Sequence, residues 1–419
     1  MSDAITCLHL ADLHFGVETY GTTNAKTGLN TRLEDFSRSM EQAIDVAIER
    51  NVDMAVFAGD AYKRNNPSPT QQRELVKHFC RLADHDIPVV MISGNHDIPV
   101  MHGKASAVDI FKSLRPGKIQ VYVNRPNNST DNPPPIIKTK NGDIAVCCLP
   151  YISPSFLRNI EAFKDLAREE FLEKCEGFIN NTVEAMLESI DDDMPRMLVT
   201  HLTVHGAKVG GYRGTLLMTD DITITAANLA NAGYDYVALG HIHHYQNLSS
   251  NDDVPVVYPG SLDRVDFGEA DEEKGAVIAS IRRGHSDVEF IPVKVRDFIE
   301  LSVQTEPGED ITEAIIEEIE AEDIEGAVVR VKFLADDKEI QAIDMKRIHE
   351  ALKPAHHKAG FIRIPRDAGN QRRKSSLSTE VTLGDALTAY IREHEELKDE
   401  SDVLMEKAKD IEQCVLKKT

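Results

Sequence analysis

The sequence predicts an α/β protein with more than one domain. Up to about residue 290, short apolar runs alternate with longer amphipathic stretches, the pattern of strands and helices packed in layers. After about residue 296 the alternation restarts on a smaller scale. A chain of 419 residues, 41% of them hydrophobic, is also too long for one ordinary domain.

The spacing of apolar residues predicts the elements of the first region. Residues 33–50 carry Phe36, Met40 and Ile44 at helical spacing, and residues 69–83 show a similar apolar face. Residues 163–187 can form one extended helix or two short ones, and residues 124–135, rich in Asn and Pro, are expected to be a surface loop or hairpin. The predicted strands are the short apolar runs at 6–10, 54–58, 89–93, 197–200, 236–239, 255–259 and 275–281.

The second half of the chain divides into three parts. Residues 296–367 are expected to form a small α+β domain beside a main domain of residues 1–295. Residues 368–382 lack apolar periodicity and are expected to be a linker. Residues 383–419 are expected to hold two short amphipathic helices, which cannot bury much of their apolar surface on each other and need a partner. In the small domain the predicted strands are 298–303, 327–334 and 361–365, and the predicted helices are 311–319 and 340–352.

Short polar motifs follow five of the predicted strands. They offer oxygen ligands at Asp12, Asp60 and Asn95. Because parallel strands end at one edge of a sheet, side chains just past each strand would gather there whatever their separation in sequence. The same motifs also supply imidazoles, at His14, His201, His241 and His243.

This ligand set suits two divalent ions that share one bridging carboxylate. Mixed carboxylate and imidazole ligands favour Mn, Fe or Zn over Ca and Mg, which prefer oxygen ligands alone. Two ions about 3.5–4 Å apart activate a bridging water and neutralise phosphoryl oxygens, as phosphoester hydrolysis requires. Any one of the motifs can equally be a turn. Their occurrence together, each at a strand end, predicts a two-metal phosphoesterase.

Composition limits the environment and the partners. The six cysteines show no CxxC pattern and no regular spacing, which favours a reducing cytoplasm over a thiolate metal site. We expect no membrane span and no export signal, and therefore a cytoplasmic, nucleoid-associated location. The net charge of −23 is unusual for a protein that binds nucleic acid, although the acidic runs lie outside the motifs and two divalent ions would add local positive charge.

The motifs, in this order, resemble those of the calcineurin-like metallophosphoesterases. Residues 236–243, 258–264 and 267–275 further resemble the D subunit of the SbcCD nuclease and the related double-strand-break repair nucleases. The likeness runs from residue 5 to about 290 and continues more loosely through the small domain, which resembles that family's capping domain. It implies a four-layer calcineurin-like sandwich with a small DNA-binding capping domain and a C-terminal helical tail.

The resemblance also implies a role for each motif residue. His96 would donate a proton to the leaving 3′ oxygen, since the usual imidazole pKa lies near neutrality. The alternative is that His96 only positions Asn95. The implied ligands are Asp12, His14 and His243 for one ion and Asn95, His201 and His241 for the other, with Asp60 bridging both.

One position departs from the pattern. Lys63 stands where many phosphoesterases have an aspartate and some relatives of this nuclease have a histidine. A lysine side chain cannot accept a hydrogen bond from His96, so Asp97 or a distant residue would have to orient that imidazole. Lys63 and its neighbour Arg64 are instead candidate contacts to DNA phosphates. An ordinary exposed lysine is the alternative.

The predicted function is a manganese-dependent DNA nuclease subunit in double-strand break repair, with 3′→5′ exonuclease and single-strand or hairpin endonuclease activity. Its cofactor would be two Mn²⁺ ions, or else Mg²⁺, Fe²⁺ or Zn²⁺. The alternatives are a phosphoesterase for small phosphodiesters or phosphoproteins, and a non-catalytic tether for DNA ends.

The resemblance implies protein partners as well. Residues 383–419 would dock on an SbcC-like ABC ATPase of the SMC type, unless they fold back on the chain or dimerise. A homodimer through helices of the catalytic domain is also implied. Leu75, Phe79 and Leu82 could contribute to that dimer, and core packing explains them equally well.

Overall fold

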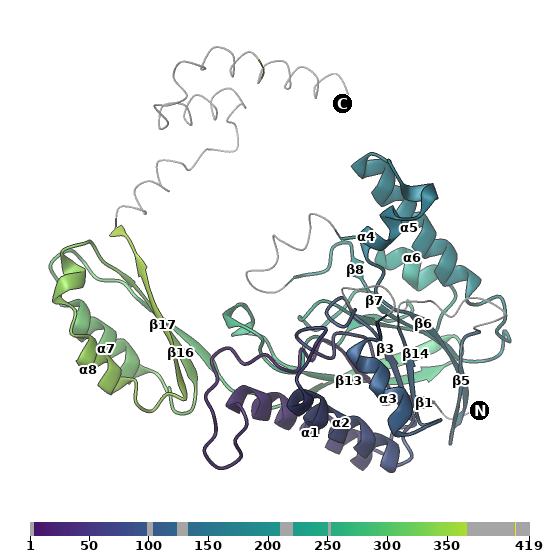
Figure 1. Ribbon diagram of the computed structural model, residues 1–419, viewed down its shortest axis with the longest axis horizontal. Helices are drawn as coiled ribbons and strands as arrows, with labels where there is room; N and C mark the ends of the chain where they lie inside the picture. Colours follow the sequence, from purple (N-terminus) through teal and green to yellow (C-terminus); the bar gives the residue numbers. More distant parts are fainter. Residues whose placement is uncertain are drawn as a thin grey trace. The chain divides into compact units, whose positions relative to one another are not determined.

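The computed structural model describes residues 4–98, 104–123, 133–209, 221–249, 253–366 and 407 (Figure 1). The described residues form two compact units. The larger unit contains the described residues of Met1–Glu300 together with Asp323–Arg330 and Leu352–Ala359. The smaller unit contains Leu301–Glu322, Val331–Ala351 and the described residues from Gly360 onward. Within this described part, no helix is long and apolar enough to span a bilayer. The expected linker and helical tail lie outside the described residues, apart from Lys407.

Two six-stranded sheets form the centre of the larger unit. The first has the strand order β14-β13-β1-β2-β3-β4, in which β1 to β4 run parallel and β13 is antiparallel to both β1 and β14. Its strands are β1 (Ile5–Leu10), β2 (Met54–Phe57), β3 (Val89–Ile92), β4 (Ile119–Tyr122), β13 (Gly275–Arg282) and β14 (His285–Pro292).

The second sheet has the order β11-β12-β10-β7-β6-β5. Its four central strands are parallel, and an antiparallel strand closes each edge. A separate parallel pair joins β8 (Thr203–Val204) to β9 (Thr223–Ile224). The strands of the second sheet are β5 (Ile136–Thr139), β6 (Gly142–Leu149), β7 (Arg196–His201), β10 (Tyr236–Gly240), β11 (Gln246–Asn247) and β12 (Val256–Tyr258).

Helices cover the outer faces of the two sheets, which pack face to face through one buried apolar layer. The outer face of the first sheet packs against α1 (Thr31–Glu49), α2 (Pro69–Asp84) and α3 (Phe111–Leu114). That of the second packs against α5 (Arg168–Ala185) and α6 (Ala226–Asn231), which Figure 1 shows beside the short α4 (Pro154–Arg158). The predicted four-layer sandwich is confirmed.

The helices of the sandwich begin at the residues that local chemistry favours. The Asn30 side chain accepts the backbone N–H of Arg32 at the start of α1. At the start of α2, Ser68 and Gln71 form a reciprocal capping box with Pro69 at the first helical position. Within residues 163–187 there is one long helix, α5 (Arg168–Ala185), and the 3-10 turn Glu161–Phe163 precedes it.

The apolar face of α2 lies in the core. Leu75, Phe79 and Leu82 are each fully buried against the first sheet. Core packing therefore accounts for these three residues, and they do not offer a surface to a second copy of the chain.

A three-stranded sheet of order β15-β16-β17 follows the sandwich in sequence, formed by β15 (Phe298–Val303), β16 (Val328–Leu334) and β17 (His357–Ile364). Two helices accompany it, α7 (Ile311–Ala321) and α8 (Met345–Ala351). The predicted single helix over 340–352 is wrong. A 3-10 turn ends at Ala342, and α8 begins anew because the Asp344 carboxylate accepts the backbone N–H groups of Lys346 and Arg347.

Candidate metal centre

The motif loops after β1, β2, β3, β7 and β10 meet at the carboxyl ends of these strands. Backbone hydrogen bonds tie the first loop to the second, from Asp12 N to Gly59 O and from His14 N to Asp60 O, both 3.0 Å long. Several residues of these loops have positive φ angles, which non-glycine residues rarely adopt. They are Asp12 (51°), His14 (45°), Asp60 (58°) and His241 (106°). Such strain commonly gathers at functional sites.

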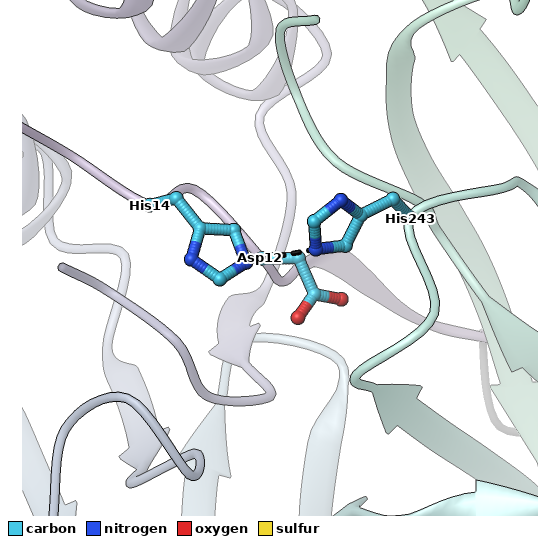
Figure 2. A group of neighbouring side chains, drawn as sticks. All are labelled: Asp12, His14 and His243. Atoms are coloured by element: carbon cyan, nitrogen blue, oxygen red, sulfur yellow. Dashed lines mark hydrogen bonds between the residues drawn. The ribbon is translucent and has the colours of Figure 1, made fainter. Parts of the chain in front are cut away.

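The first candidate ligand group is Asp12, His14 and His243. Each offers one donor atom, and these atoms all lie within 4.8 Å of one another. Figure 2 shows the two imidazoles turned toward each other beside the Asp12 carboxylate, with 2.8 Å between their Nε2 atoms. The loop after β1 and the loop after β10 thus supply this group together.

The second group is Asn95, His201 and His241. Oδ1 of Asn95 lies 3.0 Å from Nε2 of His201 and 3.2 Å from Nδ1 of His241. The other ring nitrogen of His201, Nδ1, lies 2.7 Å from the carbonyl oxygen of Ala58. That contact leaves Nε2 of His201 facing Asn95.

Asp60 lies between the two groups. Its Oδ2 is 3.6 Å from Nε2 of His14 in the first group and 3.6 Å from Nε2 of His201 in the second. Its Oδ1 accepts the backbone N–H of His96 at 2.8 Å. A Cβ atom on Gly94 would overlap Oδ1 of Asp60, so only glycine allows this close approach. Every residue expected to bind metal is therefore brought to one place.

The electrostatics of the centre suit a bound cation. Burial and the neighbouring Asp60 raise the pKa of Asp12 well above its usual value, and the same two causes raise the pKa of Asp97 to about 7. Burial lowers the pKa of His201 to about 4, so this imidazole stays neutral and can donate its lone pair. Crowded buried carboxylates beside a neutral imidazole form a donor set that fits divalent metal ions.

Two further carboxylates, which the sequence analysis did not identify, form hydrogen bonds with the imidazoles of His241 and His243. Oδ2 of Asp221 lies 2.9 Å from Nε2 of His241, and Oε1 of Glu269 lies 2.7 Å from Nδ1 of His243. Burial alone would raise the pKa of Glu269, but Lys274 and His243 outweigh burial and hold it far below its usual value. A signal for Glu269 was present, since it lies within the segment 267–275 that carries the family resemblance.

His96 lies at the mouth of the centre. Its side chain is 29% exposed, and its Nε2 is 3.9 Å from Oδ2 of Asp60. Its Nδ1 lies 3.0 Å from the main-chain oxygen of Lys63. The Asp97 carboxylate instead accepts the backbone N–H groups of Gly94, Ala61 and Tyr62. Asp97 therefore does not orient His96, because main-chain N–H groups occupy its carboxylate. The main-chain oxygen of residue 63 contacts Nδ1 whatever its side chain, and the distant residue Asp60 lies near Nε2.

Lys63 and Arg64 line a separate pocket of about 480 Å³, together with Glu18, Gln71 and other polar residues. Phe15 also lines this pocket and directly follows His14 of the metal centre. The cleft over the metal centre is smaller, about 40 Å³, and is lined by residues of both ligand groups.

A layered α/β sandwich that presents carboxylates and imidazoles from the ends of five strands defines a metal-dependent hydrolase of phosphoesters. The chain belongs to the calcineurin-like phosphoesterase family, whose model matches residues 5–245. Membership implies a dinuclear metal centre, for which the two groups supply candidate ligands.

Two further comparisons describe what the chain is similar to. It is 27% identical to the DNA double-strand break repair protein Mre11 of Archaeoglobus fulgidus over 353 residues, which cover 82% of this chain and 70% of that protein. A crystal structure of a dimetal phosphatase from Danio rerio matches with a TM-score of 0.37 and 10% identity, covering 68% of this chain and 98% of that one.

Proposed function

We propose that this protein is a DNA nuclease subunit that acts in double-strand break repair and hydrolyses phosphodiester bonds with two Mn²⁺ ions. One observation carries the proposal. A single oxygen of Asp60 is equidistant, at 3.6 Å, from one imidazole of each ligand group. A bridging carboxylate between two ions needs such a position.

The proposed ligand sets follow the two groups. When bound, the ions would activate a water and neutralise the non-bridging phosphoryl oxygens. The chain's own residues supply these ligands and exclude bulk solvent, since Asp12, His14, Asp60 and His201 are buried. One ion would be held by Asp12, His14 and His243, the other by Asn95, His201 and His241, and both by Asp60.

His96 would act as the general acid. Because its Nδ1–H is donated to the Lys63 carbonyl, the proton available for transfer is the one on Nε2, which is turned toward Asp60 and the cleft. Protonation of the leaving 3′ oxygen from this nitrogen would complete cleavage. The partly exposed position of His96 suits a group that must recover a proton after each turnover.

Two observations support DNA as the substrate. The similarity to Mre11 spans 82% of this chain, and the pocket beside the centre carries Lys63 and Arg64, with Arg64 exposed. The positive side chains of Lys63 and Arg64 suit contacts to the neighbouring phosphates of a DNA strand. A small phosphoester has no such neighbouring phosphates. The net charge of −23 makes such local cations more important for binding.

The remaining parts of the proposal rest on the family resemblance. They are 3′→5′ exonuclease and hairpin endonuclease activity, a capping domain over 296–367 beside a nuclease domain over 1–295, and docking of 383–419 on an SMC-like ABC ATPase. A homodimer and a cytoplasmic location belong to the same proposal. Mg²⁺, Fe²⁺ and Zn²⁺ remain the alternatives to Mn²⁺.

The test compares DNA with a small phosphodiester. Purified protein is assayed with Mn²⁺ on linear and hairpin DNA and on bis(p-nitrophenyl) phosphate. Asp60→Ala should abolish hydrolysis of both substrates. His96→Ser should slow DNA cleavage by about 10²–10⁴-fold, the usual contribution of a general acid, while metal content stays at two ions.

The matched control for His96→Ser is His85→Ser, which changes an exposed histidine at the end of α2 and should have no effect on cleavage. Cleavage of the small ester alone would refute the nuclease proposal in favour of a small-molecule or protein phosphoesterase. Loss of an ion in His96→Ser would instead make His96 a ligand.

A further inference from the structure

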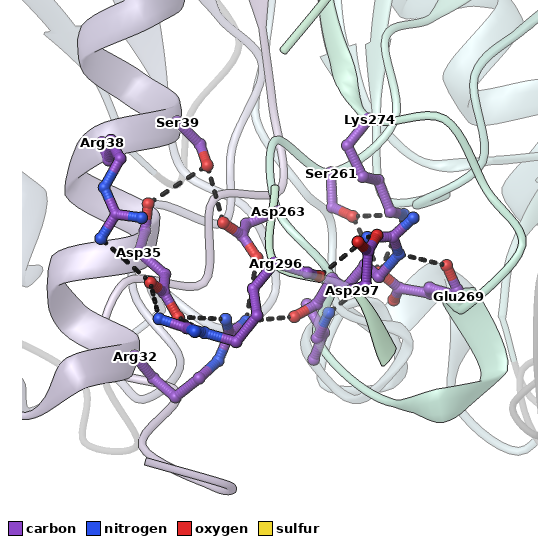
Figure 3. Close-up of polar contacts among 12 residues, drawn as sticks. Arg32, Asp35, Arg38, Ser39, Ser261, Asp263, Glu269, Lys274, Arg296 and Asp297 are labelled. Atoms are coloured by element: carbon purple, nitrogen blue, oxygen red, sulfur yellow. Dashed lines mark hydrogen bonds and ion pairs between the residues drawn. The ribbon is translucent and has the colours of Figure 1, made fainter. Parts of the chain in front are cut away.

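A largely buried polar cluster contacts His243 through Glu269; we name it the lysine cluster, and its members are Ser261, Glu269, Glu272 and Lys274. Ser261, Glu269 and Lys274 are labelled in Figure 3. Lys274 is only 2% exposed and Glu269 only 4%. Charged side chains are almost never buried this deeply unless they are paired. Burial of these charges therefore indicates that the cluster has a structural or functional role.

Lys274 is surrounded by oxygen atoms. Its Nζ lies 2.8 Å from Oε2 of Glu269, 2.7 Å from Oε2 of Glu272 and 2.9 Å from Oγ of Ser261. It also donates to the main-chain oxygen of His243 at 3.3 Å. A buried ammonium with this many acceptors is fully compensated and holds its partners in fixed positions.

The two carboxylate oxygens of Glu269 contact different groups. Oε2 accepts from Lys274, from Ser261 Oγ at 3.1 Å and from the backbone N–H of Val265 at 3.0 Å. Oε1 is turned toward Nδ1 of His243, 2.7 Å away. Three donors thus fix the carboxylate on one side, and its other oxygen is aimed at the imidazole.

This arrangement selects one tautomer of His243. A carboxylate oxygen can only accept, so Nδ1 of His243 carries the proton and donates it. The lone pair is then on Nε2, the atom that faces His14 and Asp12. Outer partners of this kind fix the orientation of ligating histidines and raise their basicity.

We propose that Glu269 is a positioning residue for metal binding, which orients His243 toward one ion, and that the buried Lys274 holds Glu269 in place. This inference rests on the two-metal centre of the proposed function. It goes beyond the ligand set, because metal binding by His243 would depend on Glu269 and Lys274, which are not ligands themselves.

The test is Mn²⁺ binding to the full-length protein after EDTA treatment, measured by titration calorimetry. In Glu269→Gln the amide N–H₂ group would face either the Lys274 ammonium or the Nδ1–H of His243. Because both of these groups are donors, the hydrogen bond to one of them would be lost. We expect the dissociation constant of one ion to rise by about 10–100-fold and that of the other to change far less.

The matched variant is Glu272→Gln. It removes the other carboxylate from the same lysine but leaves the Glu269 to His243 hydrogen bond in place. It should therefore weaken Mn²⁺ binding much less than Glu269→Gln does. Lys274→Met should reproduce the Glu269→Gln effect on one ion, and circular dichroism of each variant checks that it folds.

The outcomes separate this inference from the proposed function. Wild-type protein that binds fewer than two Mn²⁺ ions would refute the two-metal centre itself. Wild-type protein that binds two ions, with Glu269→Gln and Glu272→Gln indistinguishable, would overturn the role of Glu269. Equal weakening of both ions in Glu269→Gln would also overturn it, because that pattern reports general structural damage.

Discussion

Replacement of the buried Arg32 by methionine should destabilise the sandwich far more than removal of the exposed Arg38 from the same helix. Arg32 is fully buried at the start of this helix. Figure 3 shows its guanidinium between two carboxylates, 2.8 Å from Asp35 and 2.9 Å from Asp263. It also donates to the main-chain oxygen of Arg264 at 2.6 Å. Methionine has a similar length but supplies none of these donors.

The loss of stability depends on which hydrogen-bond donors the carboxylates of Asp35 and Asp263 keep after the substitution. Asp35 would keep its two contacts of 2.8 Å with Arg296, whereas Asp263, which is fully buried, would keep only the Ser39 hydroxyl at 2.6 Å. Burial already raises the pKa of Asp263 against the opposing effect of Arg32. Removal of one partner from a buried pair costs about 3–5 kcal/mol, so we expect Arg32→Met to lower the free energy of unfolding by that amount.

Urea denaturation at pH 7 measures the effect, with Arg38→Met as the matched control. Arg38 contacts the same Asp35 at 3.2 Å, but its side chain is 58% exposed. Exposed pairs contribute only about 0–1 kcal/mol. Asp263→Asn, added to Arg32→Met, should recover part of the loss because the unpaired charge is gone. A loss in Arg32→Met no larger than in Arg38→Met, or no recovery in the double variant, would refute this reasoning.

Four other predictions follow from the site and the core. Gly94→Ala should displace Asp60 and weaken Mn²⁺ binding, measured by calorimetry, because the added Cβ meets the carboxylate. Mn²⁺ should raise the melting temperature of EDTA-treated protein, and more at pH 8 than at pH 6, because the ligands must be deprotonated to bind it. His9→Gln should flatten the pH dependence of stability between about pH 6.5 and 3. Burial lowers the pKa of His9 to about 3, so below pH 6.5 the unfolded chain binds a proton that the native chain does not, and stability falls as pH falls. Deletion of 383–419 should spare nuclease activity of the isolated chain and abolish co-purification with the proposed ATPase.

Each of these predictions has its own control or contradiction. Gly177→Ala, at an open position in α5, should leave Mn²⁺ affinity unchanged, and equal loss in both glycine variants would contradict the role of Gly94. A melting temperature that does not respond to Mn²⁺ would argue against a metal site in the folded chain. If the urea midpoint changes with pH in the same way in His9→Gln and in the wild type, His9 is not the titrating group. ATPase association that survives the deletion would place docking elsewhere.

From the sequence it was possible to predict the layered sandwich and which residues meet at the candidate centre. Buried strands such as β2 and β10 are largely apolar runs, and each leads into a glycine and a candidate ligand, Gly59-Asp60 and Gly240-His241. These are local signals, carried by a few adjacent residues. The edge strands β5 and β14 were not predicted, because most of their residues are exposed or partly buried and neither contains such a run. The strand β6 was also not predicted, although residues 144–149 form a buried apolar run.

The contacts that hold the candidate ligands in place depend on how distant loops pack. Glu269 and Asp221 reach their histidines across 26 and 20 residues of sequence. One partner of His96 is the main-chain carbonyl of Lys63, a group that every residue carries, so no side-chain pattern could reveal this contact. Apolar periodicity specifies which residues are buried, but the direction of a hydrogen bond depends on how distant loops pack, and that is settled only when the sheets come together.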